Sequence, residues 1–272
     1  MGKSRNSLIM VPIQLNPYKK IYFSSDNHLG SPNKAISLER EKNFIIWLDQ
    51  IKSDAQAIFF LGDLFDFWFE YKKVVPKGFV RVLGKLAELK DAGINVYLFV
   101  GNHDLWMRDY FPTEFDIPVF HQPQQLSING SRVYLAHGDG LGPGDQGYKF
   151  MKKIFLNPIC KRLFRALHPD LGVRLAQYLS LNNKLISGDA DITFLGKEEE
   201  WLVQYSLEVL KGKHFVYFIY GHRHLPMTIQ LNASSKYLNL GDWIQYNTYA
   251  VFESGKIELK ALDSMTELPF YD

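Results

Sequence analysis

Cysteine and long apolar segments are both scarce in this sequence. Cys160 is the single cysteine among 272 residues, so no disulfide can form within one chain. No apolar stretch approaches the ~20 residues that a membrane-spanning helix needs. The apolar run Leu8–Val11 ends at Pro12, whereas a secretory signal has an apolar region of about 7–15 residues. We therefore expect a cytoplasmic protein.

The sequence also lacks a strong excess of charge of either sign. It has 31 Lys and Arg residues against 29 Asp and Glu, a net charge of +2, so we expect no nucleic-acid partner. Hydrophobic residues make up 46% of the chain, which excludes wholesale disorder. We expect a single domain over residues 1–272, including a helical insertion at about residues 146–190.

Short apolar segments, rich in β-branched and aromatic residues, predict five buried strands. They are Ile21–Ser25, Ala57–Leu61, Val96–Val100, Val133–Ala136 and Phe215–Tyr220. Helical patterns at about Leu38–Ile51 and Lys77–Lys90 separate the first three, which predicts an α/β fold with a parallel sheet. Asn129-Gly130 predicts the turn of a β-hairpin. The alternation over residues 227–261 predicts a β-meander.

Residues 149–174 differ from the rest of the chain because basic residues alternate with apolar ones. Seven Lys and Arg residues accompany one acid, Asp170, which gives a local charge of +6. The apolar residues recur at spacings of mostly three or four, so they predict amphipathic helices interrupted at Pro158 and Pro169. Such helices suit an anionic membrane surface, and they also suit packing against their own domain.

Asp, Asn or His follows each of the five predicted strands. The motifs are Asp26-Asn27-His28, Gly62-Asp63, Gly101-Asn102-His103-Asp104, His137-Gly138-Asp139 and Gly221-His222-Arg223-His224. Because the carboxyl ends of strands form the sites of open α/β sheets, we expect these side chains to meet at one place. The two-residue spacing of Asp26 and His28 predicts that both point the same way from an extended segment, as for His222 and His224.

Mixed nitrogen and oxygen donors at one place predict a pair of divalent metal ions. Such donors suit Mn, Fe or Zn better than Mg or Ca, which prefer oxygen alone. Two metals about 3.5–4 Å apart can generate a nucleophile and clamp a phosphoryl group. We expect Asp63 to bridge the metals, Asn102 and His137 to complete the ligand set, and Asp66 and Asp104 to orient other groups.

The order of these five motifs resembles the calcineurin-like metallophosphoesterases over nearly the whole chain. The resemblance implies a four-layer αββα sandwich with a dinuclear site and a helical insertion. It implies that one metal is held by Asp26, His28, Asp63 and His224. It implies that the other is held by Asp63, Asn102, His137 and His222. His103 would protonate the leaving oxygen or stabilise charge on the phosphoryl group, oriented by Asp104.

A narrower resemblance comes from the segment after His137. The stretches Gly138–Leu141 and Asp145–Tyr148, the basic insertion and Gly62–Trp68 are similar to the UDP-2,3-diacylglucosamine hydrolases. This resemblance implies attack by a metal-bound hydroxide on UDP-2,3-diacylglucosamine, with manganese, to give UMP and 2,3-diacylglucosamine 1-phosphate. It implies a peripheral enzyme on the cytoplasmic face of the inner membrane, whose insertion holds the acyl chains. Asp145 and Tyr148 are the expected substrate contacts.

Two other functions stay open at this point. The best-known members of that family carry Arg where this chain has His103. A metallophosphoesterase acting on a different phosphodiester or diphosphate, in a nucleotide, a nucleic acid or a phosphoprotein, is therefore the first alternative. The second is a non-enzymatic scaffold that kept the fold and lost its metals. The complete set of expected ligands speaks against the scaffold.

Overall fold

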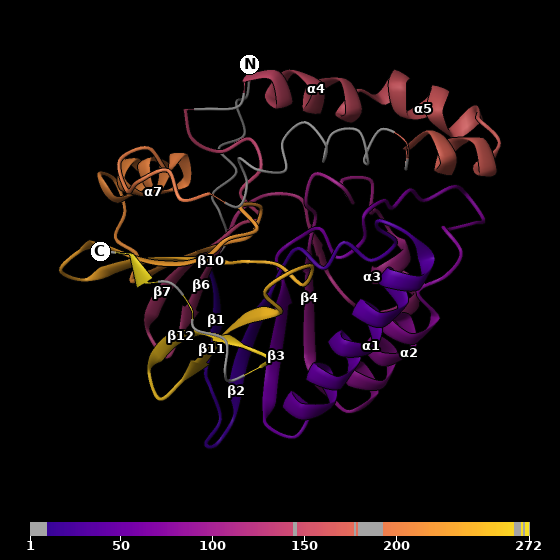
Figure 1. Ribbon diagram of the computed structural model, residues 1–272. Coiled ribbons are helices and arrows are strands. Elements are labelled where there is room, and N and C mark those ends of the chain that lie inside the picture. Colours follow the sequence, from indigo (N-terminus) through magenta and orange to yellow (C-terminus); the bar gives the residue numbers. More distant parts are fainter. Residues whose placement is uncertain are drawn as a thin grey trace, which may run out of the picture.

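The computed structural model describes residues 10–143, 146–176, 178, 193–263, 268 and 270–271. Two β-sheets lie face to face, and helices cover their outer faces (Figure 1). The result is a mixed α/β fold of four layers, which confirms the expected fold class. Within the part of the chain described, every helix is too short or too polar to span a bilayer.

One sheet has six strands. In chain order they are β2 (Lys20–Ser24), β3 (Ala55–Phe60), β4 (Asn95–Phe99), β5 (Val119–Phe120), β11 (Thr248–Glu253) and β12 (Lys256–Ala261). Their spatial order is β12-β11-β2-β3-β4-β5. The four strands β2 to β5 run parallel, which confirms the predicted parallel sheet and brings their carboxyl ends to one edge.

The other sheet has seven strands. In chain order they are β1 (Met10–Ile13), β6 (Gln124–Ile128), β7 (Ser131–Leu135), β8 (Tyr217–Tyr220), β9 (Pro226–Asn232), β10 (Ser235–Leu240) and β13 (Phe270–Tyr271). Their spatial order is β1-β6-β7-β8-β10-β9-β13, with β7, β8 and β10 parallel. β6 and β7 form the predicted hairpin, and Asn129 and Gly130 both have positive φ at its turn.

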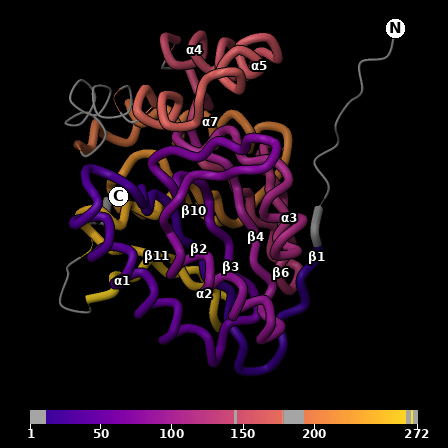
Figure 2. Tube along the Cα trace, turned by 90° about the vertical axis from the view of Figure 1, so that its right-hand side faces the viewer, coloured from indigo at the N-terminus to yellow at the C-terminus, as the bar shows by residue number. Residues whose placement is uncertain are grey.

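The helices divide between the two sheets and the edge where the strands end. On the outer face of the six-stranded sheet lie α1 (Lys34–Ile51), α2 (Val80–Asp91) and α3 (Tyr110–Phe115). α7 (Trp201–Leu210) covers the seven-stranded sheet. The insertion forms α4 (Gln146–Leu156) and α5 (Pro158–Ala166), which lie together across one end of the sheets (Figures 1 and 2).

Side chains alternate between the faces of each sheet and so create three apolar layers. In β3, Ala57 and Phe59 face the other sheet, whereas Ile58 and Phe60 face the helices. In β8, Ile219 likewise lies between the two sheets, whereas its neighbours Phe218 and Tyr220 face α7. This period of two is what allows a continuously apolar strand to be buried on both sides.

The C-terminal strands do not form the predicted meander. β9 and β10 form an antiparallel hairpin in the seven-stranded sheet, while β11 and β12 form one in the six-stranded sheet. The segment between β10 and β11 crosses from one sheet to the other. Its Trp243 packs against Phe44 and Trp47 of α1, with ring centroids 4.9 and 5.2 Å apart. Burial of this indole favours the crossing over continued hairpin pairing.

Replacing Phe44 with alanine tests the layer between α1 and the six-stranded sheet. Phe44 is fully buried against Trp47, Phe60 and Trp243. We expect Phe44→Ala to lower the free energy of unfolding, measured by urea denaturation, by about 3–5 kcal/mol. The control Ile46→Ala removes a half-exposed side chain of the same helix and should cost less than about 1 kcal/mol. Similar losses for both variants would contradict this packing.

Candidate metal centre

The predicted site residues meet at the edge where both sheets end, but from turns rather than extended segments. Asp26, His28, Asp63, His222 and His224 all have positive φ, between 44° and 71°. The expectation that two-residue spacing in an extended chain aligns these side chains is therefore wrong. Non-glycine residues adopt this left-handed region at a cost of roughly 1–3 kcal/mol each, and such strain clusters at functional sites.

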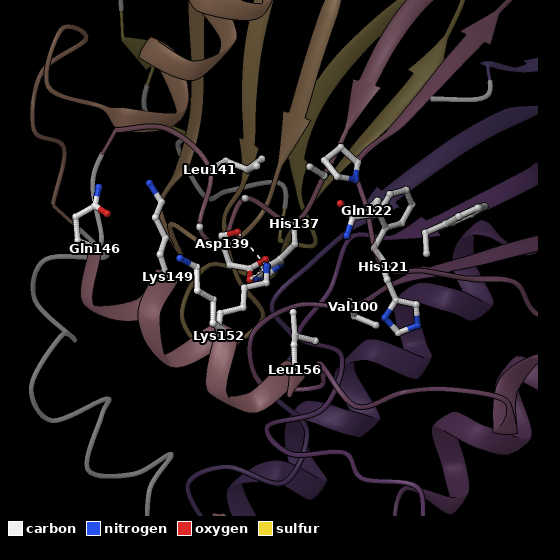
Figure 3. Close-up of a pocket in the computed structure, with 17 residues that line it drawn as sticks. Val100, His121, Gln122, His137, Asp139, Leu141, Gln146, Lys149, Lys152 and Leu156 are labelled. Atoms are coloured by element: carbon white, nitrogen blue, oxygen red, sulfur yellow. Dashed lines mark hydrogen bonds and ion pairs between the residues drawn. The ribbon is translucent and has the colours of Figure 1, made fainter. Parts of the chain in front are cut away.

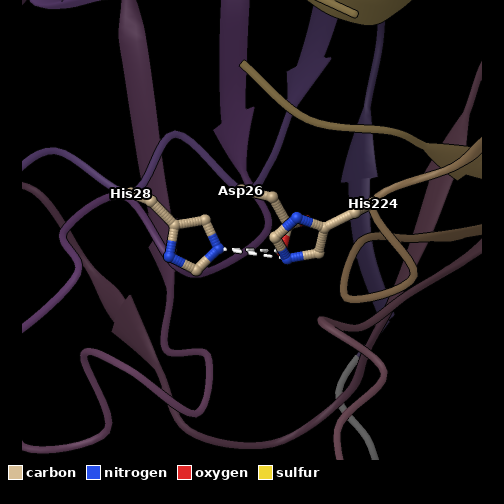
Figure 4. Close-up of side chains that lie close together, drawn as sticks. All are labelled: Asp26, His28 and His224. Atoms are coloured by element: carbon tan, nitrogen blue, oxygen red, sulfur yellow. Dashed lines mark hydrogen bonds and ion pairs between the residues drawn. The ribbon is translucent and has the colours of Figure 1, made fainter. Parts of the chain in front are cut away.

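One group of donors surrounds a single point beside β2. Asp26 Oδ1 lies 3.8 Å from His28 Nε2 and 3.5 Å from His224 Nε2. The two imidazole nitrogens are 3.2 Å apart and face each other (Figure 4). Asp26 and His28 are fully buried. These three atoms converge from chain segments almost 200 residues apart.

The hydrogen bonds behind this group decide what it can bind. His28 Nδ1 lies 3.2 Å from Asp66 Oδ1, and His224 Nδ1 lies 3.2 Å from Asp242 Oδ2. Because carboxylates only accept, each neutral ring carries its proton on Nδ1 and presents a lone pair on Nε2. Asp26 Oδ1 is buried and accepts no hydrogen bond within the described part of the chain. Three facing lone-pair donors fit a divalent cation.

A second group lies beside the first. Asn102 Oδ1 is 3.1 Å from both His137 Nε2 and His222 Nδ1. His137 Nδ1 donates to the carbonyl of Leu61 at 2.8 Å, so its Nε2 also presents a lone pair. These donors again fit a divalent cation, and they include each residue that the sequence predicts for the second metal apart from the shared Asp63.

Asp63 stands between the two groups. Its Oδ2 lies 3.6 Å from His28 Nε2 in the first group and 3.4 Å from His137 Nε2 in the second. Its Oδ1 accepts the backbone amide of His103 at 2.9 Å, which fixes the carboxylate plane. One carboxylate oxygen of Asp63 is therefore within 3.6 Å of an imidazole nitrogen from each group.

Close charges shift the pKa values of this centre strongly. Burial raises the pKa of Asp63, but the nearby imidazoles of His137, His103 and His28 together outweigh this effect and hold the pKa well below its usual range. Burial lowers the pKa of His137, but Asp63 and Asp26 together raise it to about 10. The carboxylates thus create a negative potential that attracts positive charge into a buried place.

His103 and Asp104 are both at the centre, with contacts that revise the expected role of Asp104. Both carboxylate oxygens of Asp104 accept backbone amides, from Gly101 at 2.7 Å and Leu64 at 2.9 Å among others. His103 Nδ1 instead lies 3.1 Å from the backbone carbonyl of Asp66. Asp104 therefore fixes the two ligand loops, and Asp66 fixes the imidazole of His103.

Comparison with known proteins agrees with this geometry. A family profile described as Calcineurin-like phosphoesterase matches residues 19–226, most of the chain. The chain belongs to the calcineurin-like phosphoesterase family. As a member of it, the protein is a metal-dependent hydrolase, and the Asp and His side chains of the sheet edge can hold a divalent metal.

Two curated relatives and one solved structure indicate the range of the similarity. UDP-2,3-diacylglucosamine hydrolase of Porphyromonas gingivalis is 38% identical over 259 residues, which cover 90% of this chain and 98% of that protein. The enzyme of the same name from Proteus mirabilis is 27% identical over 240 residues, covering 87% and 96%. The structure of TT1561 from Thermus thermophilus aligns over 90% of this chain and 99% of its own, with a TM-score of 0.44 and 14% identity.

The two expected substrate contacts have different outcomes. Asp145 lies outside the residues that the structure describes. Tyr148 lies on α4, and its hydroxyl donates to Asp139 Oδ2 at 2.5 Å. Lys152 Nζ contacts the same oxygen at 2.5 Å. The structure thus attaches α4 to the phosphoesterase centre through Asp139, two residues after His137.

Sequence reasoning missed Asp242, although a signal was present. Asp242 follows β10 in a Gly-Asp pair, the same pattern as Asp63 after β3. Its Oδ2 faces His224, while its Oδ1 accepts the amides of Gln245 and Tyr246. The predicted meander obscured this signal, because it placed the end of β10 away from the other strand ends.

Two buried arginines were missed without any comparable signal. Arg40 of α1 donates to the backbone carbonyls of residues 27, 28 and 31 and so holds the first ligand loop. Arg223 lies between His222 and His224, and its guanidinium pairs with Glu200 Oε1 at 2.9 Å. It also donates to the carbonyl of Thr193 at 2.7 Å, which ties the last ligand loop to the segment before α7.

The contact between Asp242 and His224 predicts a loss of metal affinity when it is changed. Asp242→Asn keeps an oxygen for the two backbone amides but removes the charge that fixes His224 in the tautomer presenting Nε2. We expect affinity for Mn²⁺, measured by calorimetric titration of metal-stripped protein, to fall about 10–100-fold. Asp116→Asn, at an exposed position directly after α3, serves as the control. Equal affinities for both variants and the unchanged protein would contradict the assigned contact.

Proposed function

We propose that this protein hydrolyses UDP-2,3-diacylglucosamine to UMP and 2,3-diacylglucosamine 1-phosphate. The observation that carries the proposal is a phosphoesterase metal centre lying directly beneath an insertion with an exposed apolar surface. The curated relatives named above support it. Both are named for that activity, and this chain aligns with nearly the whole length of each. The diphosphate linkage is the bond that breaks, with water as the second substrate.

Two metal ions would occupy the centre in this proposal. The first would be held by Asp26, His28, Asp63 and His224, and the second by Asp63, Asn102, His137 and His222. Mn²⁺ is the first choice, with Fe or Zn as alternatives, because the ligands mix imidazole with oxygen donors. When bound, such a pair supplies activation of water and neutralises charge on the phosphoryl group.

His103 would act on the substrate rather than hold a metal. Its Nδ1 faces the carbonyl of Asp66, so the opposite edge of the ring is directed away from this support. The ring lies edge-on to His28, with centroids 4.7 Å apart, and it is slightly exposed to solvent. From this position it can protonate the leaving phosphate oxygen or donate to the phosphoryl group in the transition state.

The insertion has the features expected for both roles that its sequence left open, packing against its own domain and contact with a membrane surface. Phe155 and Phe164 point inward and pack on Trp106, with centroids 5.7 and 4.9 Å away. Ile159 and Leu163 remain two-thirds exposed on α5. Exposed apolar side chains recur along this segment at positions 150, 154, 159, 163, 167, 171 and 175. Together with the local excess of Lys and Arg, this surface is suited to an anionic membrane.

We therefore place the protein at the cytoplasmic face of the inner membrane, as a peripheral protein. The acyl chains of the substrate would leave the bilayer along α4 and α5, while the diphosphate reaches the metal centre below. A basic helix gains electrostatic attraction to anionic lipids in addition to the burial of its apolar side chains.

Release of UMP tests the proposed reaction. With UDP-2,3-diacylglucosamine in detergent micelles, we expect UMP to form only when Mn²⁺ is present. His103→Ala should lower kcat by about 10²–10⁴-fold, because it removes a proton donor, and should keep the metal content of the unchanged protein. His214→Ala, which removes an exposed histidine, is the control and should keep full activity.

The alternative substrates give a different result in the same assay. No UMP, but Mn²⁺-dependent cleavage of an aryl phosphodiester, would contradict the lipid substrate and leave a phosphoesterase of other specificity. Metal content near zero in carefully prepared protein, with neither substrate cleaved, would contradict the enzyme altogether.

Flotation with vesicles tests the peripheral location separately. We expect the protein to float with vesicles that contain anionic phospholipid, and the double variant Ile159→Asp, Leu163→Asp to remain in the unbound fraction, because charge would replace the apolar face. Ile36→Asp, which replaces one half-exposed apolar side chain of α1 by a charge, should float normally. Flotation of both variants alike, or failure of the unchanged protein to float, would contradict the membrane-facing role of α5.

A further inference from the structure

A cavity of about 410 Å³ opens beside the metal centre. It lies between the ends of β4 and β5 on one side and α4 on the other, and His137 and Asp139 form the wall that it shares with the centre (Figure 3). Its size is within the range of small-molecule sites. A ligand whose phosphate reaches His137 would therefore extend directly into this cavity.

The charge on the cavity favours an anion. Three lysines of α4 line it, Lys149, Lys152 and Lys153, at spacings that put them on one side of the helix. Among the described residues that line it, Asp139 is the only acid, and that carboxylate already accepts from Lys152 and Tyr148. The remaining positive charge is available to a phosphate group, for which lysine is a common partner.

The opposite wall has the properties of a base-binding surface. Figure 3 shows His121 and Gln122 across the cavity from Lys149 and Lys152. Phe120 and Pro123, their neighbours in the chain, also line the cavity and add flat apolar surface. A nucleobase needs such a surface for its face and amide or imidazole groups for its polar edge. The side chain of Gln122 offers both a donor and an acceptor.

The two halves of a UDP-linked lipid therefore match two different surfaces. The outward apolar positions of α5 and the aromatic side of Trp106 lie away from this cavity. An acyl chain placed in the cavity would remove water from the ammonium groups of the α4 lysines and offer them no hydrogen bond in return. Such unpaired burial of charge is unfavourable in free energy. A nucleoside monophosphate would instead pair with them.

We propose that this cavity binds the nucleotide half of the substrate, with its phosphate beside the lysines of α4 and its pyrimidine against the wall formed by Phe120 to Pro123. The inference rests on the proposed function for the identity of the nucleotide. It assigns Lys149 and Lys153 as specificity-determining residues, which recognise the UMP portion rather than the lipid portion.

Product inhibition tests this assignment without needing the lipid substrate. The inhibition constant of UMP is measured on Mn²⁺-dependent hydrolysis of an aryl phosphodiester, for the unchanged protein and for Lys149→Ala, Lys153→Ala. Removal of two ammonium partners should raise that constant at least about fivefold. Lys211→Ala, at an exposed position after α7, is the matched control and should leave it unchanged. Inorganic phosphate and 2,3-diacylglucosamine 1-phosphate serve as comparison inhibitors.

The outcomes separate this inference from the proposed function. If the double substitution raises the inhibition constant of UMP more than that of either comparison inhibitor, the result supports the nucleotide site. An equal rise in the inhibition constants of inorganic phosphate and UMP would mean a phosphate site without nucleoside recognition. An unchanged inhibition constant for UMP would mean that the cavity does not bind it. Either result overturns the inference. Failure to cleave UDP-2,3-diacylglucosamine overturns the proposed function alone, because the UMP constant is measured on another substrate. Unchanged thermal unfolding of the double variant excludes misfolding as the cause.

Discussion

The structure depends on holding several lone-pair donors together in a buried place. Asp63 Oδ2 is within 3.6 Å of two imidazole nitrogens, and Asp26 Oδ1 and Asn102 Oδ1 face further nitrogens at similar distances. Such a group repels itself, and the low dielectric of the interior strengthens the repulsion. It requires positive charge. Burial lowers the pKa of His137, yet Asp63 and Asp26 raise it to about 10, which shows how strongly the carboxylates favour positive charge in this place.

The surrounding structure is arranged to keep these donors in place. Left-handed turns direct the ligands inward, and buried hydrogen bonds hold the turns. Asp104 accepts amides from both the Gly62–Phe65 loop and Gly101, while Arg40 binds the carbonyls of the first loop. Gly101 and Gly221 are required for close approach, since a Cβ at either position would collide with the side chain of Asp63 or Asp26. Loss of a supporting group of this kind typically lowers metal affinity or activity about 10–100-fold.

Much of this centre could be predicted from sequence because each ligand follows a strongly apolar strand. The motifs after β2, β3, β4, β7 and β8 are local signals, and parallel pairing brings the ends of such strands together. The crossing between β10 and β11 could not be predicted, because it depends on where Trp243 is buried and not on a local pattern. The contact between Asp242 and His224 could not be predicted either, because it depends on the course of this crossing. Arg40 and Arg223 were missed for a similar reason, since their partners are backbone carbonyls and a distant glutamate.

The most direct test of this account is the number and position of the metal ions. Anomalous diffraction from crystals grown with Mn²⁺ measures both. The account predicts two peaks, one bounded by Asp26, His28 and His224 and the other by Asn102, His137 and His222, with the carboxylate of Asp63 between them. A single peak under saturating Mn²⁺, or two peaks that leave Asp63 outside both coordination spheres, would contradict it.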